Sequence, residues 1–280
     1  MTTIDVGNLN TALTSATGAL ATNPTLAAAY NGVVYVYDKT NNTTAGVPNT
    51  LNAVRMVNGT TTPNVSDQNG NPLGFSVVSN NGVYVQGDYN TTTITVGAET
   101  INNPTAIMGD AVTALSQGWN PAQSGLPITV PTILNGMTSI REATASAPTA
   151  ANGVNPASHG TAAGMTVNAA ILTGNTPSTT TYGSGGAQNL VRMIEDWFYP
   201  DPTGTHTGMV LTLNGSLGQL FSSKYFPGAY RTGPQVGLGG DRVYIQPMTR
   251  NFLYDSGFKT RSPAGSPTTT NFARGDFFFW

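Results

Sequence analysis

The sequence predicts an all-β protein, and within that class a right-handed parallel β-helix (β-solenoid) with a long loop excursion and an aromatic C-terminal tail. Three observations lead to this prediction. Short runs rich in Val and Tyr alternate with turn residues, the 280 residues include 33 Gly and 18 Pro, and the starts of the runs recur at similar intervals. Turn-dense chains of this kind suit many short strands better than long helices.

The clearest stretch runs from Leu73 to Asn90 and contains two β-type runs, Phe75–Ser79 and Val83–Gln86. Val and Tyr favour strands, and the Asn80-Asn81-Gly82 sequence between the runs favours the positive φ angles of a tight turn. We interpret the stretch as one corner and two faces of a β-coil.

Other runs repeat this design before and after the central stretch. The starts at Val33, Ala53 and Phe75 follow one another at nearly equal intervals, and the later starts at Thr166, Leu190 and Met209 do the same. Both series recur every ~20 residues, which fits one turn of a parallel β-solenoid. An antiparallel sandwich, also built from short strands at regular spacing, is the alternative.

These runs divide the chain into three parts. Residues 1–30 are expected to form a lead-in or capping segment, because Gly7, Gly18 and Pro24 interrupt any long helix. Residues 31–225 are expected to form the solenoid, with a loop excursion at about 120–164 that is rich in Pro, Ala, Thr, Ser and Gly. Residues 226–280 form an aromatic C-terminal segment.

Composition narrows the classes of partner. Only 9% of the residues are charged, against about 25% in ordinary soluble proteins, and the net charge is −2. This balance argues against nucleic acid as a partner. The chain has no Cys and no apolar run long enough for a membrane span, so we expect neither a thiolate metal site nor a transmembrane helix.

The location is inferred from the same composition. The N-terminal sequence lacks the basic start and apolar core of a signal peptide, so the chain is either intracellular or the mature or truncated part of an exported protein. Richness in Asn and Thr with few Lys favours export. We therefore expect an extracellular or cell-surface location.

Residues suited to catalysis are sparse, and we expect no catalytic residue, cofactor or metal. Histidine occurs only at His159 and His206, both in surroundings rich in Gly and Thr. Glu195-Asp196 is the only adjacent acidic pair, and neighbours on a strand point to opposite faces. A glycosidase would have to recruit Asp88 or Asp110 from another coil. We favour structural roles for these carboxylates, as turn caps or as acceptors for buried backbone groups.

An enzyme that acts on polysaccharides on a β-helix scaffold is the alternative function. Its sugar-stacking candidates are Tyr89, Trp119 and Trp197. Surface carbohydrate is therefore kept as a second partner class. Six Asn-X-Ser/Thr sequons are candidates for glycosylation, at Asn41, Asn42, Asn58, Asn64, Asn90 and Asn214.

Across residues 30–260 the chain resembles the extracellular C-terminal region of PilX-like, type IV pilin-related surface proteins of Verrucomicrobia and Planctomycetes. The matching runs follow the order of that family: Ala53-Val54-Arg55 with Asn58-Gly59, Val83–Asn90, Gly109-Asp110-Ala111 with Leu115-Ser116 and Trp119-Asn120, Thr166–Ala170 with Thr173-Gly174, Gly185-Gly186 before Glu195-Asp196-Trp197, Asn214-Gly215-Ser216, and Pro247 with Arg250-Asn251-Phe252, Asp255 and Phe258. The resemblance implies a surface protein. Such proteins begin with a pilin-like hydrophobic helix, which this sequence lacks.

Together these features predict a non-enzymatic, extracellular structural or adhesive protein that self-associates into a homo-oligomer, a filament or a pilus-like structure. The predicted assembly residues are the terminal aromatic residues Phe277, Phe278, Phe279 and Trp280. Burying four large rings contributes on the order of 6–10 kcal/mol before ordering costs. We expect them to dock on the chain's own core or in a neighbouring subunit, and at this stage we favour the neighbour.

Overall fold

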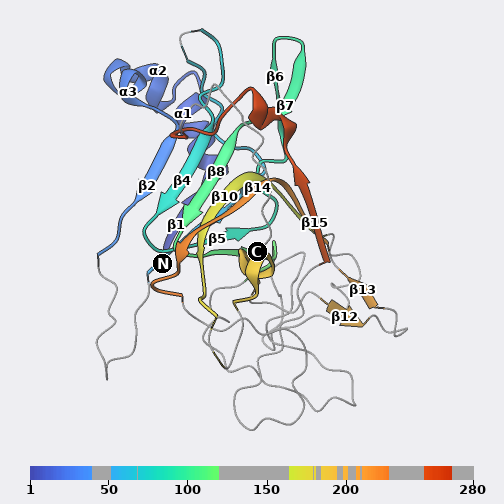
Figure 1. Cartoon of the computed structure of the whole chain (residues 1–280). Helices are drawn as coiled ribbons and strands as arrows, with labels where there is room; N and C mark the ends of the chain where they lie inside the picture. Colours follow the sequence, from blue (N-terminus) through green and yellow to red (C-terminus); the bar gives the residue numbers. More distant parts are fainter. Residues whose placement is uncertain are drawn as a thin grey trace, which may run out of the picture.

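The computed structural model describes residues 1–39, 52–67, 69–119, 164–178, 180, 184–193, 198–200, 206–208, 210–226 and 249–266. Most of its strands form two parallel sheets, which we call sheet A and sheet B (Figure 1). The strand order is β1-β3-β5-β9-β11 in sheet A and β15-β14-β10-β8-β4-β2 in sheet B.

The bounds of the elements are as follows. Sheet A contains β1 (Thr2–Asp5), β3 (Ala53–Val57), β5 (Gly82–Gln86), β9 (Val112–Leu115) and β11 (Val191–Met193). Sheet B contains β2 (Val33–Val36), β4 (Phe75–Ser79), β8 (Thr105–Gly109), β10 (Met165–Asn175), β14 (Val210–Ser222) and β15 (Thr249–Tyr254). Two antiparallel pairs join β6 (Thr93–Val96) to β7 (Glu99–Asn102) and β12 (Phe198–Pro200) to β13 (His206–Gly208). The helices are α1 (Val6–Thr14), α2 (Ala19–Thr22), α3 (Pro24–Ala29) and the 3₁₀ turns η3 (Gly186–Asn189) and η4 (Ser256–Lys259).

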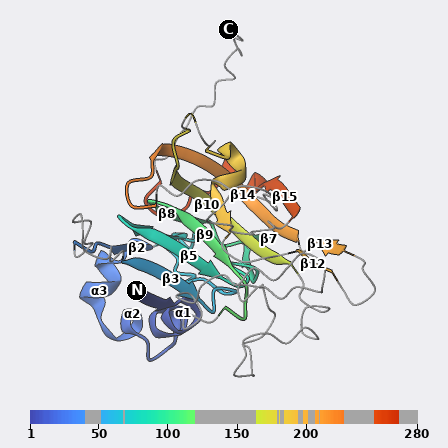
Figure 2. The ribbon, with the colours of Figure 1, turned by 90° about the horizontal axis from the view of Figure 1, so that it is seen from below.

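Three short helices occupy most of the N-terminal segment. The Asp5 carboxylate accepts a hydrogen bond from the backbone N–H of Asn8 (2.9 Å) and so caps α1, and Pro24 occupies the first turn of α3. Figures 1 and 2 show the helices beside β1 and β2, with β15 on the opposite side of the molecule. The segment also supplies a strand, because β1 pairs in parallel with β3.

The prediction of an all-β, right-handed parallel β-helix is wrong. The described strands form two separate open parallel sheets, accompanied by helices and antiparallel pairs, and no repeated coil is found among them. The predicted starts at Val33, Ala53 and Phe75 belong in turn to sheets B, A and B. The regular interval therefore separates strands that follow one another along the chain but lie in different sheets, so these neighbours do not pair.

Within the two sheets, strands that do pair are separated by longer stretches of chain than the predicted interval, and the lengths of these stretches differ across the fold. In sheet A, Val54 pairs with Val83 and Val83 with Val112, and these two steps along the chain are equally long. In sheet B, the step from β4 to β8 is of similar length, but Ile107 of β8 pairs with Ile171 of β10 after a step more than twice as long. Connections of such different lengths do not form a solenoid of constant repeat.

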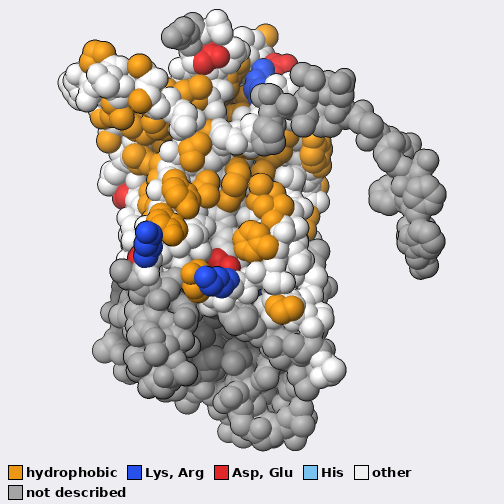
Figure 3. Space-filling view, turned by 60° about the vertical axis from the view of Figure 1, so that its left-hand side comes forward, with side chains coloured by type: hydrophobic (Ala, Val, Ile, Leu, Met, Phe, Trp, Pro, Cys, Tyr) orange, Lys and Arg blue, Asp and Glu red, His pale blue; other side chains and the backbone are white. Residues whose placement is uncertain are grey.

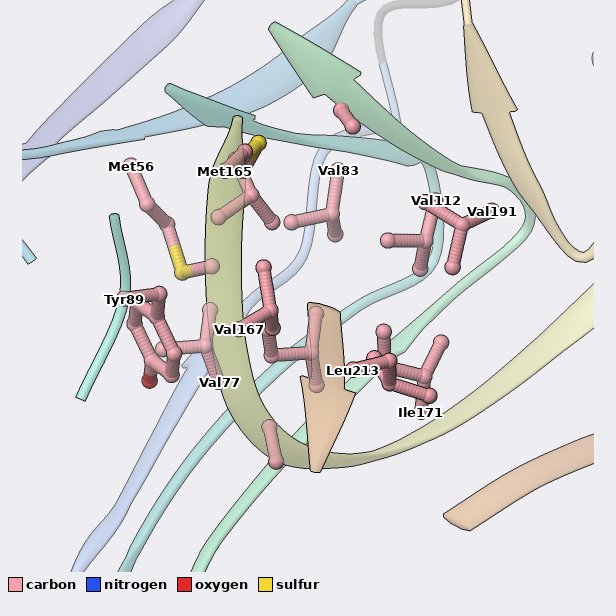
Figure 4. Packing of buried hydrophobic residues seen from close by; sticks show 14 of the residues in the cluster. Met56, Val77, Val83, Tyr89, Val112, Met165, Val167, Ile171, Val191 and Leu213 are labelled. Carbon is pink, nitrogen blue, oxygen red and sulfur yellow. The ribbon is translucent and has the colours of Figure 1, made fainter. Parts of the chain in front are cut away.

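The hydrophobic core fills the space between the two sheets (Figure 4). Each strand contributes apolar side chains at alternate positions, as expected when one face of a strand is buried. From sheet A come Val54, Val83, Val112 and Val191, and from sheet B Val77, Val167, Ile171 and Leu213, all at most 3% exposed. Branched side chains dominate these positions because they pack well on a pleated surface.

The segment that follows β15 crosses one end of sheet B. We call residues 261–266 the strap. The Ser76 hydroxyl of β4 donates a hydrogen bond to the carbonyl oxygen of Ala264 (2.6 Å), and both groups are buried. At Gly74, φ is +75° and an added Cβ would lie 2.6 Å from the Pro104 carbonyl oxygen and 3.0 Å from the Ala264 nitrogen. Only glycine lets the strap and the start of β8 approach this closely.

We expect Gly74→Ala to lower the free energy of unfolding by about 2–4 kcal/mol, because it combines left-handed backbone strain with a clash against two backbone segments. The matched control is Gly97→Ala. At Gly97, φ is +62° and nothing lies within 4 Å of an added Cβ, so only the backbone cost of about 1 kcal/mol applies. Urea unfolding checks both variants, and equal losses would contradict the packing argument.

Tyr89 carries a polar atom in the core. It is 1% exposed, and its hydroxyl has no hydrogen-bond partner within the described structure. Since a buried hydroxyl without a partner is costly, we expect Tyr89→Phe to raise the free energy of unfolding by about 0.5–2 kcal/mol. Tyr35→Phe, at a side chain that is 60% exposed, should change it by less than about 0.5 kcal/mol. Chemical denaturation measures both, and a destabilised Tyr89→Phe variant would contradict the expectation.

The same tyrosine affects stability in alkali. Burial raises the pKa of Tyr89, and it raises the pKa of Tyr30 to about 12, whereas an unfolded tyrosine titrates near 10. The unfolded chain therefore loses these protons first. The part of the free energy of unfolding that depends on these two protonated hydroxyls is fully present below about pH 10. It is lost as the pH rises further. Tyr89→Phe should flatten this alkaline loss in denaturation curves measured between pH 9 and 11.

Candidate assembly surface

Several of the sequence-predicted site residues lie outside the described residues. These are the predicted assembly residues Phe277, Phe278, Phe279 and Trp280, the acidic pair Glu195-Asp196, and Trp197 and His159. His206 begins β13, but nothing is described of its side chain. The predicted excursion is described only at Gly164, which immediately precedes β10. The geometry of a site must therefore come from other residues.

The two described candidate carboxylates bind backbone amides. Asp88 is exposed, and its Oδ1 accepts a hydrogen bond from the Thr166 backbone N–H at 2.7 Å. Asp110 is buried and accepts from the Ser223 hydroxyl (2.7 Å) and from the backbone N–H groups of Lys224 (2.7 Å) and Tyr225 (2.8 Å). The expectation of a structural role as an acceptor for buried backbone groups is confirmed for Asp110, whereas Asp88 accepts its backbone hydrogen bond at an exposed site.

Asp110 anchors the chain just after β14. Its acceptor oxygens hold residues 223–225 against the corner between β8 and β9, where the Asp110 N–H donates to the Asn81 carbonyl oxygen at 3.0 Å. Arg192 of β11 lies in the same region and donates to the Phe226 carbonyl oxygen and to the Thr176 hydroxyl. Burial lowers the pKa of Arg192, and the negative charge of Asp110 opposes this change. The group therefore ties both sheets to the end of β14.

Two of the sugar-stacking candidates are in the interior. Tyr89 is 1% exposed and Trp119 is 9% exposed, so neither ring offers a face to a ligand. The exposed aromatic residues lie instead at the two edges of sheet B, at Tyr35, Tyr37, Phe252 and Tyr254, and on β14, at Phe221. Tyr35 of β2 is 60% exposed, and Tyr37, just after this strand, is 57% exposed. Their rings lie on the same side of the strand, with centroids 6.1 Å apart. Lys39 lies over the Tyr37 ring.

Strand β15 forms the opposite edge of sheet B. Within the described structure it pairs with β14 alone, from Val210↔Thr249 to Gly215↔Tyr254. Because Leu213 faces the core, its partner Phe252 points to the inner side of the sheet, and Leu253 points to the outer side. Phe252, Leu253 and Tyr254 are 37%, 51% and 58% exposed. Each face of this edge strand thus exposes at least one apolar side chain to solvent.

A second apolar surface runs across the outer face of sheet B. Val34, Val77, Ile107 and Ile171 pack in or against the core, so the residues that follow them point outward. These are Tyr35, Val78, Met108 and Leu172, which are paired in register from β2 to β10. The Phe221 ring of β14 continues the row over Gly174. We call these five residues the apolar band, and Figure 3 shows hydrophobic side chains crossing this face.

The described sequons differ in how well they expose the asparagine side chain. Asn90 is 1% exposed and its amide donates to the Asn103 and Asn168 carbonyl oxygens. The Asn58 amide donates to the Asp5 carboxylate at 2.8 Å, and Asn214 is half-buried within β14. Asn64 is exposed, which makes it the best suited of the four for glycosylation.

The described residues were expected to hold neither a membrane span nor a metal site, and two features of their structure are relevant to this. None of the helices there is long and apolar enough to cross a membrane. Likewise, the described His, Asp and Glu side chains include no group of three that could hold a metal ion.

No family model, curated protein or solved structure matches this chain. The resemblance to pilin-related surface proteins therefore stays a prediction from sequence, and the function must be argued from the residues themselves.

We expect Asp110→Asn to lower the free energy of unfolding by about 2–4 kcal/mol, because an amide cannot accept all three hydrogen bonds and the negative charge of Asp110 near Arg192 is lost. Asp88→Asn is the matched control, since it weakens one hydrogen bond at an exposed site and should cost less than about 1 kcal/mol. Thermal and urea unfolding of both variants test the difference, and similar losses would contradict the anchoring role.

Proposed function

We propose that this chain is a non-enzymatic structural or adhesive module of the cell surface that works by assembling with further copies of itself. The observation that carries the proposal is β15, an edge strand that exposes Phe252 and Tyr254 on one side and Leu253 on the other. Edge strands of soluble proteins are usually protected by charges, by proline or by a covering segment. Strand β15, with the sequence Thr-Arg-Asn-Phe-Leu-Tyr, has one charged residue, near its beginning.

The chemistry of this edge suits a β-strand as its partner. A free edge presents unpaired backbone N–H and C=O groups, and an added strand satisfies them while covering the side chains on both faces. Completing the burial of the three exposed side chains contributes about 2–4 kcal/mol. Pairing of β15 with β2 of a second copy would continue sheet B in parallel. Because β2 and β15 are different surfaces, such a contact repeats without closing and favours a filament.

The composition supports the same function. With 9% charged residues and a net charge of −2, copies of the chain repel each other only weakly. The surface location rests on the richness in Asn and Thr and on the resemblance to pilin-related surface proteins. Carbohydrate remains a second partner class, for which the exposed rings of Tyr35 and Tyr37 are the described candidates.

The alternative, an enzyme that cleaves polysaccharides, has less support. Asp88 and Asp110 are engaged by backbone amides, and the rings of Tyr89 and Trp119 are buried. Among the described residues, the carboxylates and rings that the sequence suggested for this enzyme are therefore hydrogen-bonded to the backbone or buried. We do not advance this function.

We expect Leu253→Lys to weaken self-association at least about tenfold, since it places a strongly hydrated charge on the outer side of the edge strand. The matched control is Leu220→Lys. Leu220 is 62% exposed on β14, beyond the residues that pair with β15, and its replacement should leave assembly unchanged. Sedimentation velocity over a range of concentrations gives both dissociation constants. A chain that stays monomeric at every concentration, or equal effects of the two variants, would refute assembly through β15.

A further inference from the structure

The strap determines where the C-terminal residues leave the described structure. Ala264 packs against the position of Gly32, and an added Cβ at Gly265 would lie 3.1 Å from a methyl group of Val33. Ser266, the last described residue, therefore follows directly on a contact with the start of β2. Val33 and Tyr35 are two positions apart on the same face of that strand, so the chain leaves the strap next to the first residue of the apolar band.

We propose that the apolar band is the docking site for the C-terminal aromatic residues Phe277–Trp280 of the same chain. The band joins four hydrophobic side chains of neighbouring strands to the Phe221 ring, on a sheet face that the strap crosses at one end. A contiguous apolar patch on a protein surface marks a contact site. The terminal run of three Phe and one Trp has the matching chemistry.

The length of the intervening chain is sufficient. The segment from Ser266 to Phe277 spans at most about 36–40 Å when extended. The band crosses five strands that lie about 4.8 Å apart, a width of about 19 Å. The aromatic residues therefore reach every part of the band without crossing the edge of the sheet.

The length of this connection also determines whether the band is occupied by the C-terminal residues of its own chain or by those of a second copy. A short tether holds the aromatic residues at an effective concentration of about 1 mM near their own band, far above the concentration of other copies in a dilute solution. Docking within one chain therefore prevails over the intersubunit contact that the sequence alone favoured. The proposal does not depend on assembly through β15, which uses the edge of the sheet rather than this face.

Cross-linking tests the proposal directly, because the natural chain contains no cysteine. One variant combines Val78→Cys in the band with Asp276→Cys beside the aromatic residues. The control combines Asp276→Cys with Thr2→Cys, an exposed position on β1 of sheet A. Each is treated with a short dimaleimide at a protein concentration of about 10 μM, well below the effective concentration of a tethered tail. The products are separated by size and mapped by mass spectrometry.

If the aromatic residues dock on their own band, cross-linked monomer should form at least about tenfold faster in the Val78 variant than in the control. Equal rates would mean that the tail has no preferred site and would overturn the proposal. Cross-linked dimers as the main product would overturn it as well, because the occupant would then come from a second copy. Neither outcome bears on the Leu253→Lys measurement, so the two proposals fail separately.

A second measurement avoids the introduced cysteines. Removing residues 275–280 should increase the fluorescence of 8-anilinonaphthalene-1-sulfonate, which binds exposed apolar surface, and adding Leu172→Gln should reverse most of that increase. Leu26→Gln, at an exposed leucine of α3, serves as the control in the truncated chain and should leave the increase in place. Unchanged dye binding after truncation would overturn the proposal.

Discussion

The structure depends on the packing of two parallel sheets through inward-facing rows of branched side chains. Each row continues from strand to strand in register, as in Val54, Val83 and Val112 of sheet A. Parallel strands cannot be joined by short hairpins, so every added strand requires a crossover whose length is free to vary. The inward-facing row of side chains, rather than the length of the connection, therefore determines which strands pair. It also explains why shorter and much longer connections coexist in one fold.

The corners between the sheets are held by uncharged polar groups rather than by ion pairs. The buried Asn90 amide donates to the carbonyl oxygens of Asn103 and Asn168, and its own Oδ1 accepts from the Thr62 hydroxyl. Amides and hydroxyls satisfy backbone groups at a lower desolvation cost than charges would. This role accounts for part of the Asn and Thr richness that the sequence analysis had related only to export. The buried carboxylate of Asp110 is the exception, and it receives three hydrogen bonds.

Local strand signals were readable from the sequence, whereas their partners were not. The run Phe75–Ser79 is β4 as predicted, because its apolar residues and flanking turn signals are local. The Asn214-Gly215 pair is typical of tight turns, yet it lies inside β14, where Gly215 allows close approach to the Ala169 backbone. The role of β15 was missed, because nothing local distinguishes an edge strand from a central one. Sheet assignment depends on contacts between segments far apart in the chain, which spacing alone does not encode.

The four edge strands of the two sheets differ in what lies against them. This difference identifies the edge best suited to contact another molecule. The chain turns from β1 directly into α1, and the strap contacts the start of β2 on the outer face of sheet B but not along the pairing edge of that strand. At β11, Arg192 bonds to the segment after β14. Among the described residues, no comparable segment contacts the edge of β15, and the apolar side chains of this strand are exposed on both faces. Parallel sheets are normally covered on both faces, so the β15 edge and the outer face of sheet B, as far as the described residues show them, are two separate apolar surfaces suited to a partner. A strand from another copy suits the first because it satisfies backbone groups, whereas a cluster of rings suits the second because that face offers only side chains.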